Sequence, residues 1–178
     1  MIVLSRESIT QELPLEFNNL IIRELERADI DNYANWPMYQ GYRKMFNSSL
    51  KSRPYSDREK RWNNYLNGTS SVAIILESKS EKTLGQFFLL DIDWETRSVG
   101  NMSIRLHPEY CDQGIGAMAL KKTVEFVFSQ GMYSIEFDVL ASNIGAVKSY
   151  KKAGFSIKEE IEKDNALFYI MSIQNQCV

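Results

Sequence analysis

Two glycines at a loop-to-helix junction are the part of the sequence best suited to contact a ligand. The junction reads Gln113-Gly114-Ile115-Gly116-Ala117. Glycine permits a positive φ and a close approach to the backbone, and a helix starting here offers unpaired N–H groups and the positive end of its dipole. Together these features could cradle a phosphate or pyrophosphate. The alternative is a tight turn and helix start without a ligand, which we favour for a lone pair of glycines.

The same glycines fit a dinucleotide-binding fingerprint, Gly114-x-Gly116-x-x-Ala119, with Glu136 about 20 residues further on. In that fold the glycine turn follows its strand directly. Here Pro108 and a longer loop intervene, and only about 40 residues follow Glu136, too few for the further parallel strands. A dinucleotide-dependent oxidoreductase therefore ranks low. A Walker phosphate loop is excluded, because no Gly-Lys-Ser/Thr follows.

Histidine and cysteine are scarce, which limits the remaining site chemistry. The chain has one histidine, His107, and two cysteines, Cys111 and Cys177. Two cysteines are too few for a disulfide scaffold or a structural zinc cluster, so we expect no metal site. A Ser-His-Asp hydrolase could use only His107 as its base, and a His107–Cys111 nucleophile pair is a weak signal.

Two longer segments, Met102 to Ala117 and Val139 to Phe155, carry a more specific pattern. In this order and spacing they closely resemble the GCN5-related N-acetyltransferase (GNAT) superfamily. Its acyl-CoA signature, Gln/Arg-x-x-Gly-x-Gly/Ala, falls on Cys111-x-x-Gly114-x-Gly116. Cys111 thus stands where Gln or Arg is usual, which removes one side-chain contact near the pyrophosphate.

A second family pattern, Asn-x-x-Ala-x-x-x-Tyr-x-x-x-Gly-Phe, falls on Asn143, Ala146, Tyr150, Gly154 and Phe155. The opening Leu20–Asp29 is also typical of the family. The chain is a long form of the family, with a polar helix that starts at Ser56–Glu59. In this respect it most resembles the branch whose members acetylate ribosomal-protein N-termini, polyamines, and amino-sugars or antibiotics.

The resemblance implies acetyl-CoA as co-substrate. The pantetheine arm would lie beside the strand that ends at Leu106, the pyrophosphate would sit on backbone amides of the glycine loop, and Asn143 would contact the arm or the carbonyl region. The cofactor-binding residues implied in this way are Ile104, Leu106, Cys111, Asp112, Gln113, Gly114, Ile115, Gly116, Ala117 and Asn143.

The resemblance also implies a catalytic role for Tyr150. A deprotonated amine would attack the thioester, backbone N–H donors would stabilise the oxyanion, and Tyr150 would protonate the departing thiolate. The alternative is a helix tyrosine that packs on the sheet. The general base stays open: many relatives have a Glu where this chain has Asn101, and Asp91, Asp93 or an ordered water could replace it.

Length and composition favour one soluble domain. The 178 residues include 21 Lys+Arg and 23 Asp+Glu, a net charge of −2, and are 44% hydrophobic. This ordinary mixture excludes a disordered chain and argues against a nucleic-acid binder. No signal-peptide core and no run of about 20 apolar residues is visible, so we expect a cytoplasmic protein without a membrane segment. We expect a single N-acetyltransferase domain over residues 1–178, with a core at about 18–173.

The expected class is α/β (or α+β), a GNAT-like mixed sheet of about seven strands flanked by helices. A polar leader precedes the first strand. Alternating and continuous apolar runs predict strands over 20–25, 71–77, 84–92, 99–106, 133–139, 155–161 and 166–173. Capping and helical spacing predict helices over 27–36, 56–67, 114–130 and 143–152. The connection from 99–106 to 133–139 should be a parallel, right-handed crossover.

The early aromatic residues are expected to pack on the two early helices. These helices border the acceptor site in the family, so some of the aromatic residues could line that site. They are Trp36, Tyr39, Tyr42, Trp62 and Tyr65.

The expected function is acetyl-CoA-dependent acetylation of a primary amine: a protein N-terminus, a polyamine, an amino-sugar or an antibiotic. The sequence does not choose among these acceptors. A non-catalytic acyl-CoA sensor of the same fold is the alternative, motivated by Asn101 and Cys111. Nucleic acid and membrane partners are not expected. Homodimers are common among relatives, and the oligomeric state stays open.

Overall fold

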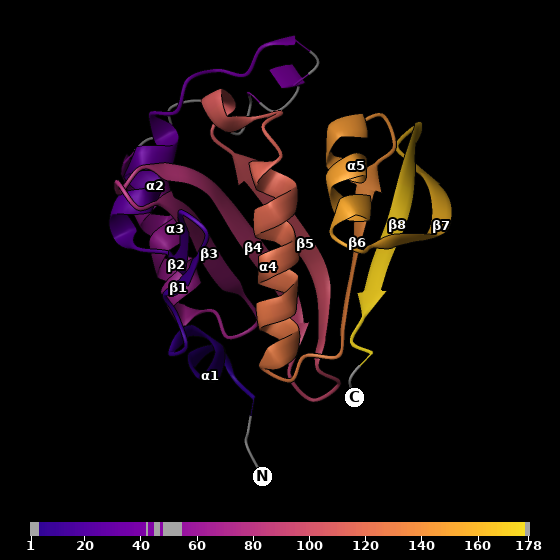
Figure 1. Ribbon diagram of the computed structural model, residues 1–178, viewed down its shortest axis with the longest axis horizontal. Coiled ribbons are helices and arrows are strands. Elements are labelled where there is room, and N and C mark those ends of the chain that lie inside the picture. Colours follow the sequence, from indigo (N-terminus) through magenta and orange to yellow (C-terminus); the bar gives the residue numbers. More distant parts are fainter. Residues whose placement is uncertain (1–3, 42, 45–46, 48–54, 177–178) are drawn as a thin grey trace.

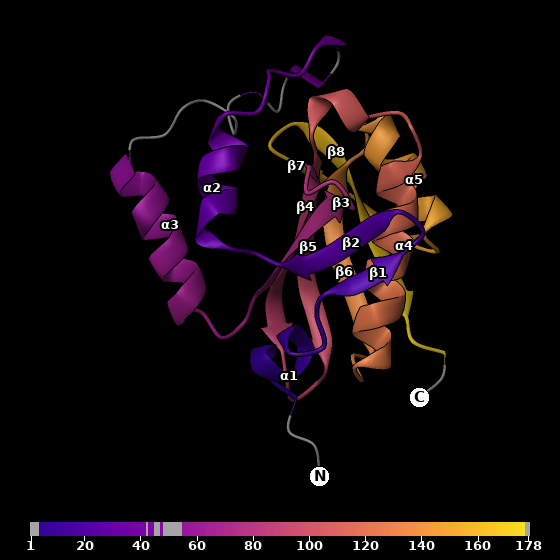
Figure 2. The ribbon, with the colours of Figure 1, turned by 60° about the vertical axis from the view of Figure 1, so that its left-hand side comes forward.

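One mixed sheet of eight strands organises the chain, in the order β1-β2-β3-β4-β5-β6-β8-β7. The computed structural model describes residues 4–41, 43–44, 47 and 55–176. Helices α4 and α5 lie on one face of the sheet, and α2 and α3 lie on the other (Figure 1, Figure 2). The predicted α/β class with a mixed sheet is confirmed.

The elements between residues 20 and 174 match the predicted ones, with ends that differ by at most two residues. The strands are β1 (Leu15–Phe17), β2 (Leu20–Glu24), β3 (Val72–Ser78), β4 (Thr83–Asp93), β5 (Ser98–Leu106), β6 (Ser134–Leu140), β7 (Ser156–Lys163) and β8 (Ala166–Gln174). The helices are α1 (Arg6–Thr10), α2 (Arg27–Ala34), α3 (Tyr55–Asn67), α4 (Ile115–Ser129) and α5 (Ile144–Lys152), with a short 3-10 helix at Pro108–Tyr110. The Ser56 side chain of the predicted capping box lies outside the described residues.

The polar leader before Leu20 contains two elements that the sequence does not predict. Helix α1 and strand β1 occupy that stretch, and β1 pairs antiparallel with β2. Helix α1 has five residues and β1 has three, so neither is long enough to show a periodic apolar pattern. A single fully buried side chain, Ile9, joins α1 to the main core.

The apolar run of β3 is continuous because both faces of this strand are covered. Val72, Ile74 and Leu76 belong to the large core beneath α4, whereas Ala73 and Ile75 belong to a smaller cluster with α2 and α3 residues. The sheet thus separates two apolar layers, and both are needed to position the helices on its two sides.

The predicted parallel crossover is confirmed, since β5 lies parallel to β6 with α4 between them in the chain. The pairing is short. Within the described chain it joins only Ser98 to Ser134 and Val99 to Ile135, although β4 pairs with β5 as far as Leu106. Toward Leu106, one edge of β5 is therefore open.

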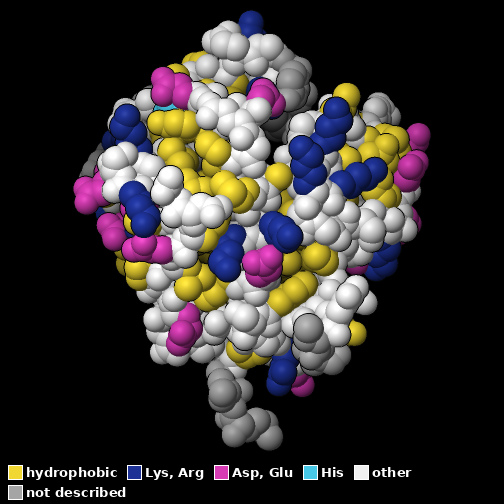
Figure 3. All heavy atoms as spheres, in the orientation of Figure 1, with side chains coloured by type: hydrophobic (Ala, Val, Ile, Leu, Met, Phe, Trp, Pro, Cys, Tyr) yellow, Lys and Arg dark blue, Asp and Glu magenta, His cyan; other side chains and the backbone are white. Residues whose placement is uncertain are grey.

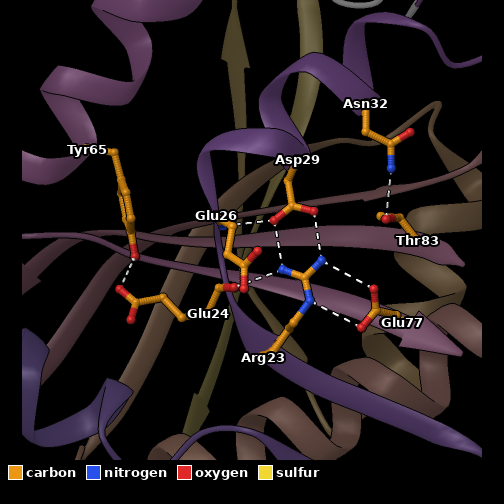
Figure 4. Close-up of polar contacts among 8 residues, drawn as sticks. All are labelled: Arg23, Glu24, Glu26, Asp29, Asn32, Tyr65, Glu77 and Thr83. Atoms are coloured by element: carbon orange, nitrogen blue, oxygen red, sulfur yellow. Dashed lines mark hydrogen bonds and ion pairs between the residues drawn. The ribbon is translucent and has the colours of Figure 1, made fainter. Parts of the chain in front are cut away.

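An ion-pair network centred on Arg23 joins helix α2 to strands β2 and β3 (Figure 4). The Arg23 guanidinium on β2 donates to both Asp29 oxygens at 2.7 and 2.8 Å and to both Glu77 oxygens at 3.2 and 3.3 Å. The Asp29 carboxylate, in a residue 4% exposed, also accepts the backbone N–H of Glu26 at the start of α2. These contacts raise the pKa of Arg23, chiefly through the hydrogen bond to Asp29. The network therefore fixes α2 against β2 and β3.

No helix within the described ranges is both long and apolar enough to cross a membrane.

The Asp29→Ala variant should lower the free energy of unfolding by about 2–3 kcal/mol, because it leaves a partly buried cation short of a partner. The loss is bounded because the Arg23 side chain keeps Glu77 and is 19% exposed. Urea denaturation measures it. Glu136→Gln is the control, since it breaks an ion pair with Lys158 whose side chains are 57% and 44% exposed, and it should cost less than about 1 kcal/mol. Equal effects for the two variants would contradict the role of Asp29.

Candidate active site

A cavity of about 380 Å³ lies along the open stretch of β5, between this strand, the N-terminus of α4 and helix α5. Most residues expected to bind the cofactor line it. They are Ile104, Leu106, Cys111, Asp112, Gly114, Gly116, Ala117 and Asn143, together with Tyr150. Gln113 and Ile115 are not part of the lining. Segments far apart in the sequence thus meet at one cavity.

The backbone of β5 presents hydrogen-bonding groups to this cavity. The N–H of His107 donates to Leu84 O on the β4 side at 2.8 Å. Because successive residues of a strand point their backbone groups to alternate edges, Arg105 also faces β4, and Ile104 and Leu106 face the open edge. These are the two strand residues expected to pair with the pantetheine arm.

The glycine loop has the geometry of an anion-binding turn. Gly114 caps α4 with φ +77°, and a Cβ there would meet no atom within 4 Å. The first intrahelical bond runs from Met118 N to Gly114 O, so the amides of Ile115 to Ala117 form the first turn, where N–H groups have no intrahelical acceptor.

Gly116 has a packing role. A Cβ on it would lie 2.8 Å from Leu106 Cδ1, which shows how closely α4 approaches β5.

Side chains around the loop hold it in place. Arg43 donates to both oxygens of Asp112 at 2.6 and 2.8 Å, which lowers the pKa of this carboxyl group. The Gln113 Nε2 group donates to Glu109 O at 2.7 Å. The two polar side chains of the loop therefore contact protein groups.

Cys111 and His107 form no nucleophile pair in this geometry. The Cys111 sulfur lies 3.8 Å from the backbone oxygen of His107, and the thiol packs against the cluster of Tyr33, Trp36 and Tyr39. Burial raises the pKa of this thiol, so it stays protonated at neutral pH. The His107 ring accepts the Glu109 N–H at 3.3 Å and contacts Trp36 at 5.1 Å between ring centroids. Both residues shape the loop.

Tyr150 lies on α5 and forms part of the cavity wall. It is 4% exposed, and its ring packs against Phe137 at 4.5 Å and Phe155 at 5.9 Å between centroids. Burial raises the pKa of its phenol. The tyrosine thus packs on the sheet and also borders the cavity, so the two sequence interpretations are compatible. Gly154, at φ +104°, ends α5 and directs Phe155 back beneath the ring.

Asn143 caps the same helix. Its Oδ1 accepts the Ala146 N–H at 3.4 Å, and the residue lines the cavity. The motif that links Asn143 to Tyr150 therefore runs from the N-cap of α5 to a residue of the same helix, and both residues border the cavity.

The candidate bases lie elsewhere. Asp91, Asp93 and Asn101 do not line the cavity. Asp93 is opposite Ser98, at the far end of β5, where its carboxylate accepts the Glu95 and Thr96 N–H groups. The hydrogen bond from Thr96 is the main cause of its lowered pKa. The geometry therefore does not support the two aspartates as bases.

Sequence reasoning did not place Tyr39 at the cavity along β5, which it lines. Its hydroxyl donates to Leu106 O at 2.6 Å, on the open edge of β5. Tyr39 follows α2 in an irregular segment, so no periodic pattern could place it. Tyr42, one of the other early aromatic residues, lies outside the described residues, as does Cys177.

A second cavity of about 350 Å³ lies on the α2/α3 side of the sheet. Its walls come from both helices and from the β4 and β5 side chains that point away from the main core. The lining residues are Tyr33, Arg61, Gln86, Phe88, Leu90, Ser103 and Arg105. Ser103 and Arg105 line both cavities, so the two cavities meet at the same stretch of β5.

Comparison with known proteins decides the family. The model of the acetyltransferase (GNAT) domain matches residues 19–156. The chain belongs to the GNAT acetyltransferase family. An uncharacterized N-acetyltransferase of Methanocaldococcus jannaschii is 26% identical over 163 residues, which cover 85% of this chain and 69% of that relative.

Solved structures support the GNAT fold. The spermidine N-acetyltransferase of Vibrio cholerae in complex with CoA and spermine has a TM-score of 0.70 at 19% identity, covering 88% of this chain and 95% of that one. A chimera of this Vibrio enzyme with hSSAT has a TM-score of 0.72 at 18% identity, covering 88% and 96%. The expected fold and the expected enzyme class, an N-acetyltransferase, are confirmed.

Proposed function

We propose that this GNAT protein transfers the acetyl group of acetyl-CoA to a primary amine, with the cofactor in the cavity along β5. One observation carries the proposal: the buried Tyr150 and the open backbone edge at Ile104 and Leu106 line the same cavity. The complex of the Vibrio relative with CoA and spermine supports a CoA co-substrate and an amine acceptor.

The cavity fits the parts of CoA. The open edge of β5 would pair with the amide groups of the pantetheine arm, as an added strand does. The first-turn amides of α4 would receive the pyrophosphate. Lys148 and Lys152 of α5 and Arg43 also line the cavity, and Figure 3 shows basic side chains gathered over α5. The two lysines would neutralise the phosphates, whereas Arg43 is paired with Asp112.

When bound, acetyl-CoA would supply a reactive thioester. The amine nitrogen forms the new C–N bond as the C–S bond breaks, and the electron pair of that bond leaves with sulfur. The amine proton goes to water, because the carboxylate among the described lining residues, Asp112, is paired with Arg43. Water is thus the base that we favour among the three sequence-based candidates.

Tyr150 would protonate the departing thiolate and recover its proton from solvent. A general acid must be protonated before the step, and burial raises the pKa of Tyr150 above its ordinary value. The phenol therefore keeps its proton through the neutral and mildly alkaline range. Loss of activity through its ionisation should begin only above about pH 10.

The Tyr150→Phe variant should lower kcat by about 100-fold and leave the Kd for acetyl-CoA within about twofold, since the ring is kept and only the acid is lost. Detection of the released CoA thiol measures kcat, and calorimetry measures Kd. A variant with unchanged kcat would remove Tyr150 from the mechanism. An acyl-CoA sensor would instead bind acetyl-CoA without releasing CoA to any amine, in the wild type as in the variant.

The Gly114→Ala variant should weaken acetyl-CoA binding by about tenfold. A Cβ at φ +77° costs about 1–2 kcal/mol in the turn that aims the α4 amides. Gly131→Ala is the matched control, because Gly131 also has a positive φ, of +96°, and meets only ordinary contacts, but lies at the other end of α4. Equal loss of affinity in both variants would show general destabilisation and contradict the binding role of Gly114.

A further inference from the structure

The second cavity has a positive lining. Arg61 of α3 and Arg105 of β5 contribute cationic side chains, and the described residues that line it include no Asp or Glu. The Arg61 guanidinium carbon lies 5.6 Å from the centroid of the Tyr33 ring and 5.3 Å from that of Phe88. Two aromatic rings thus fix this cation in the cavity wall.

Four nearby carboxylates form ion pairs with arginines that do not line the cavity. Asp29 and Glu77 pair with Arg23, and Asp31 and Glu59 pair with Arg27. In the sequence, residues 35–54, which connect the two helices of this side, contain no acidic residue and four basic ones, Arg43, Lys44, Lys51 and Arg53. The carboxylates of Asp29, Asp31, Glu59 and Glu77 therefore pair with cations other than those that line the cavity.

A buried polar side chain also faces this cavity. Gln86 on β4 lines it and is only 2% exposed. The amide group offers one hydrogen-bond acceptor and two N–H donors to a polar ligand in the cavity.

The position of the cavity suits an acceptor. Ser103 and Arg105 line both cavities, so a molecule in the second cavity lies across β5 from the proposed thioester site. Its volume of about 350 Å³ lies within the usual range for small-molecule pockets.

We propose that the acceptor amine carries a carboxylate group, which Arg61 and Arg105 bind while Gln86 hydrogen-bonds the same molecule. The proposal rests on the acetyl-transfer function proposed above and names its substrate class. Guanidinium groups match carboxylates in charge and geometry. A polyamine has the opposite charge and would be repelled by this lining.

Matched acceptors test the charge requirement on the wild-type protein. Amino acids, their C-terminal amides and spermidine are compared by the rate of CoA release from acetyl-CoA. We expect kcat/KM for the acids to exceed that for the amides by at least about tenfold, because the amide removes a charged hydrogen-bond acceptor. Spermidine should be the poorest of the three. Equal rates for acids and amides, or a preference for spermidine, would overturn the proposal.

Variants then locate the carboxylate. Arg61→Gln should lower kcat/KM for the acids by about tenfold and leave the amides almost unchanged. Lys60→Gln is the matched control, since it removes one positive charge from an exposed neighbour on the same helix. Loss of selectivity in both variants, or in neither, would contradict a contact with Arg61.

A binding measurement separates this proposal from the proposed reaction. The acids and amides are titrated by calorimetry into the protein saturated with CoA, where no transfer can occur. Selective binding of the acids that Arg61→Gln weakens supports the inference even if no acceptor releases CoA, an outcome that would reject only the acetyl transfer. Absence of selective binding of the acids would reject the inference and leave the reaction to be judged by CoA release.

Discussion

The separation of β5 from β6 is the constraint on which the site depends. Within the described chain the two strands share paired positions only at Ser98 and Val99 of β5, and Met102 to Leu106 line a cavity. Backbone N–H and C=O groups that lose a partner strand need another one. Tyr39 supplies it for Leu106 O, and we propose that the pantetheine arm supplies the rest. The fold thus creates the binding edge by leaving one strand pairing incomplete.

The two faces of β5 have different roles, one in the large core and the other at the second cavity. Residues such as Met102 and Ile104 turn toward α4 and pack with the large core, whereas Ser103 and Arg105 turn toward the α2/α3 side, where they line the second cavity. Because side chains alternate along a strand, one strand can border both cavities. The Arg23 network then holds α2 in place on that second side, so a buried ion pair at a distance fixes the walls of the proposed acceptor site.

The sequence was informative where the signal was local and repeated. The alternation in β5 and the helical spacing after the glycines of α4 predicted their elements closely, and the resemblance placed Tyr150 on a helix that the structure brings to the cavity. Helix α1 and β1 were too short to leave a pattern. Tyr39, Gln86 and Arg61 could not be assigned to the cavities, since their positions depend on how irregular segments and separate elements pack together. Asp91 and Asp93 were candidate bases because they are close to β5 in the sequence. The structure does not bring them to the cavity.

Amide hydrogen exchange, followed by mass spectrometry or NMR with and without saturating acetyl-CoA, tests the central claim most directly. If the cofactor completes the edge of β5, protection should rise at Ile104 and Leu106 and at the first turn of α4, Ile115 to Ala117. The amides of β1 and β7, at the two outer edges of the sheet, should be unchanged. Binding of acetyl-CoA without added protection at Ile104 and Leu106 would contradict the account.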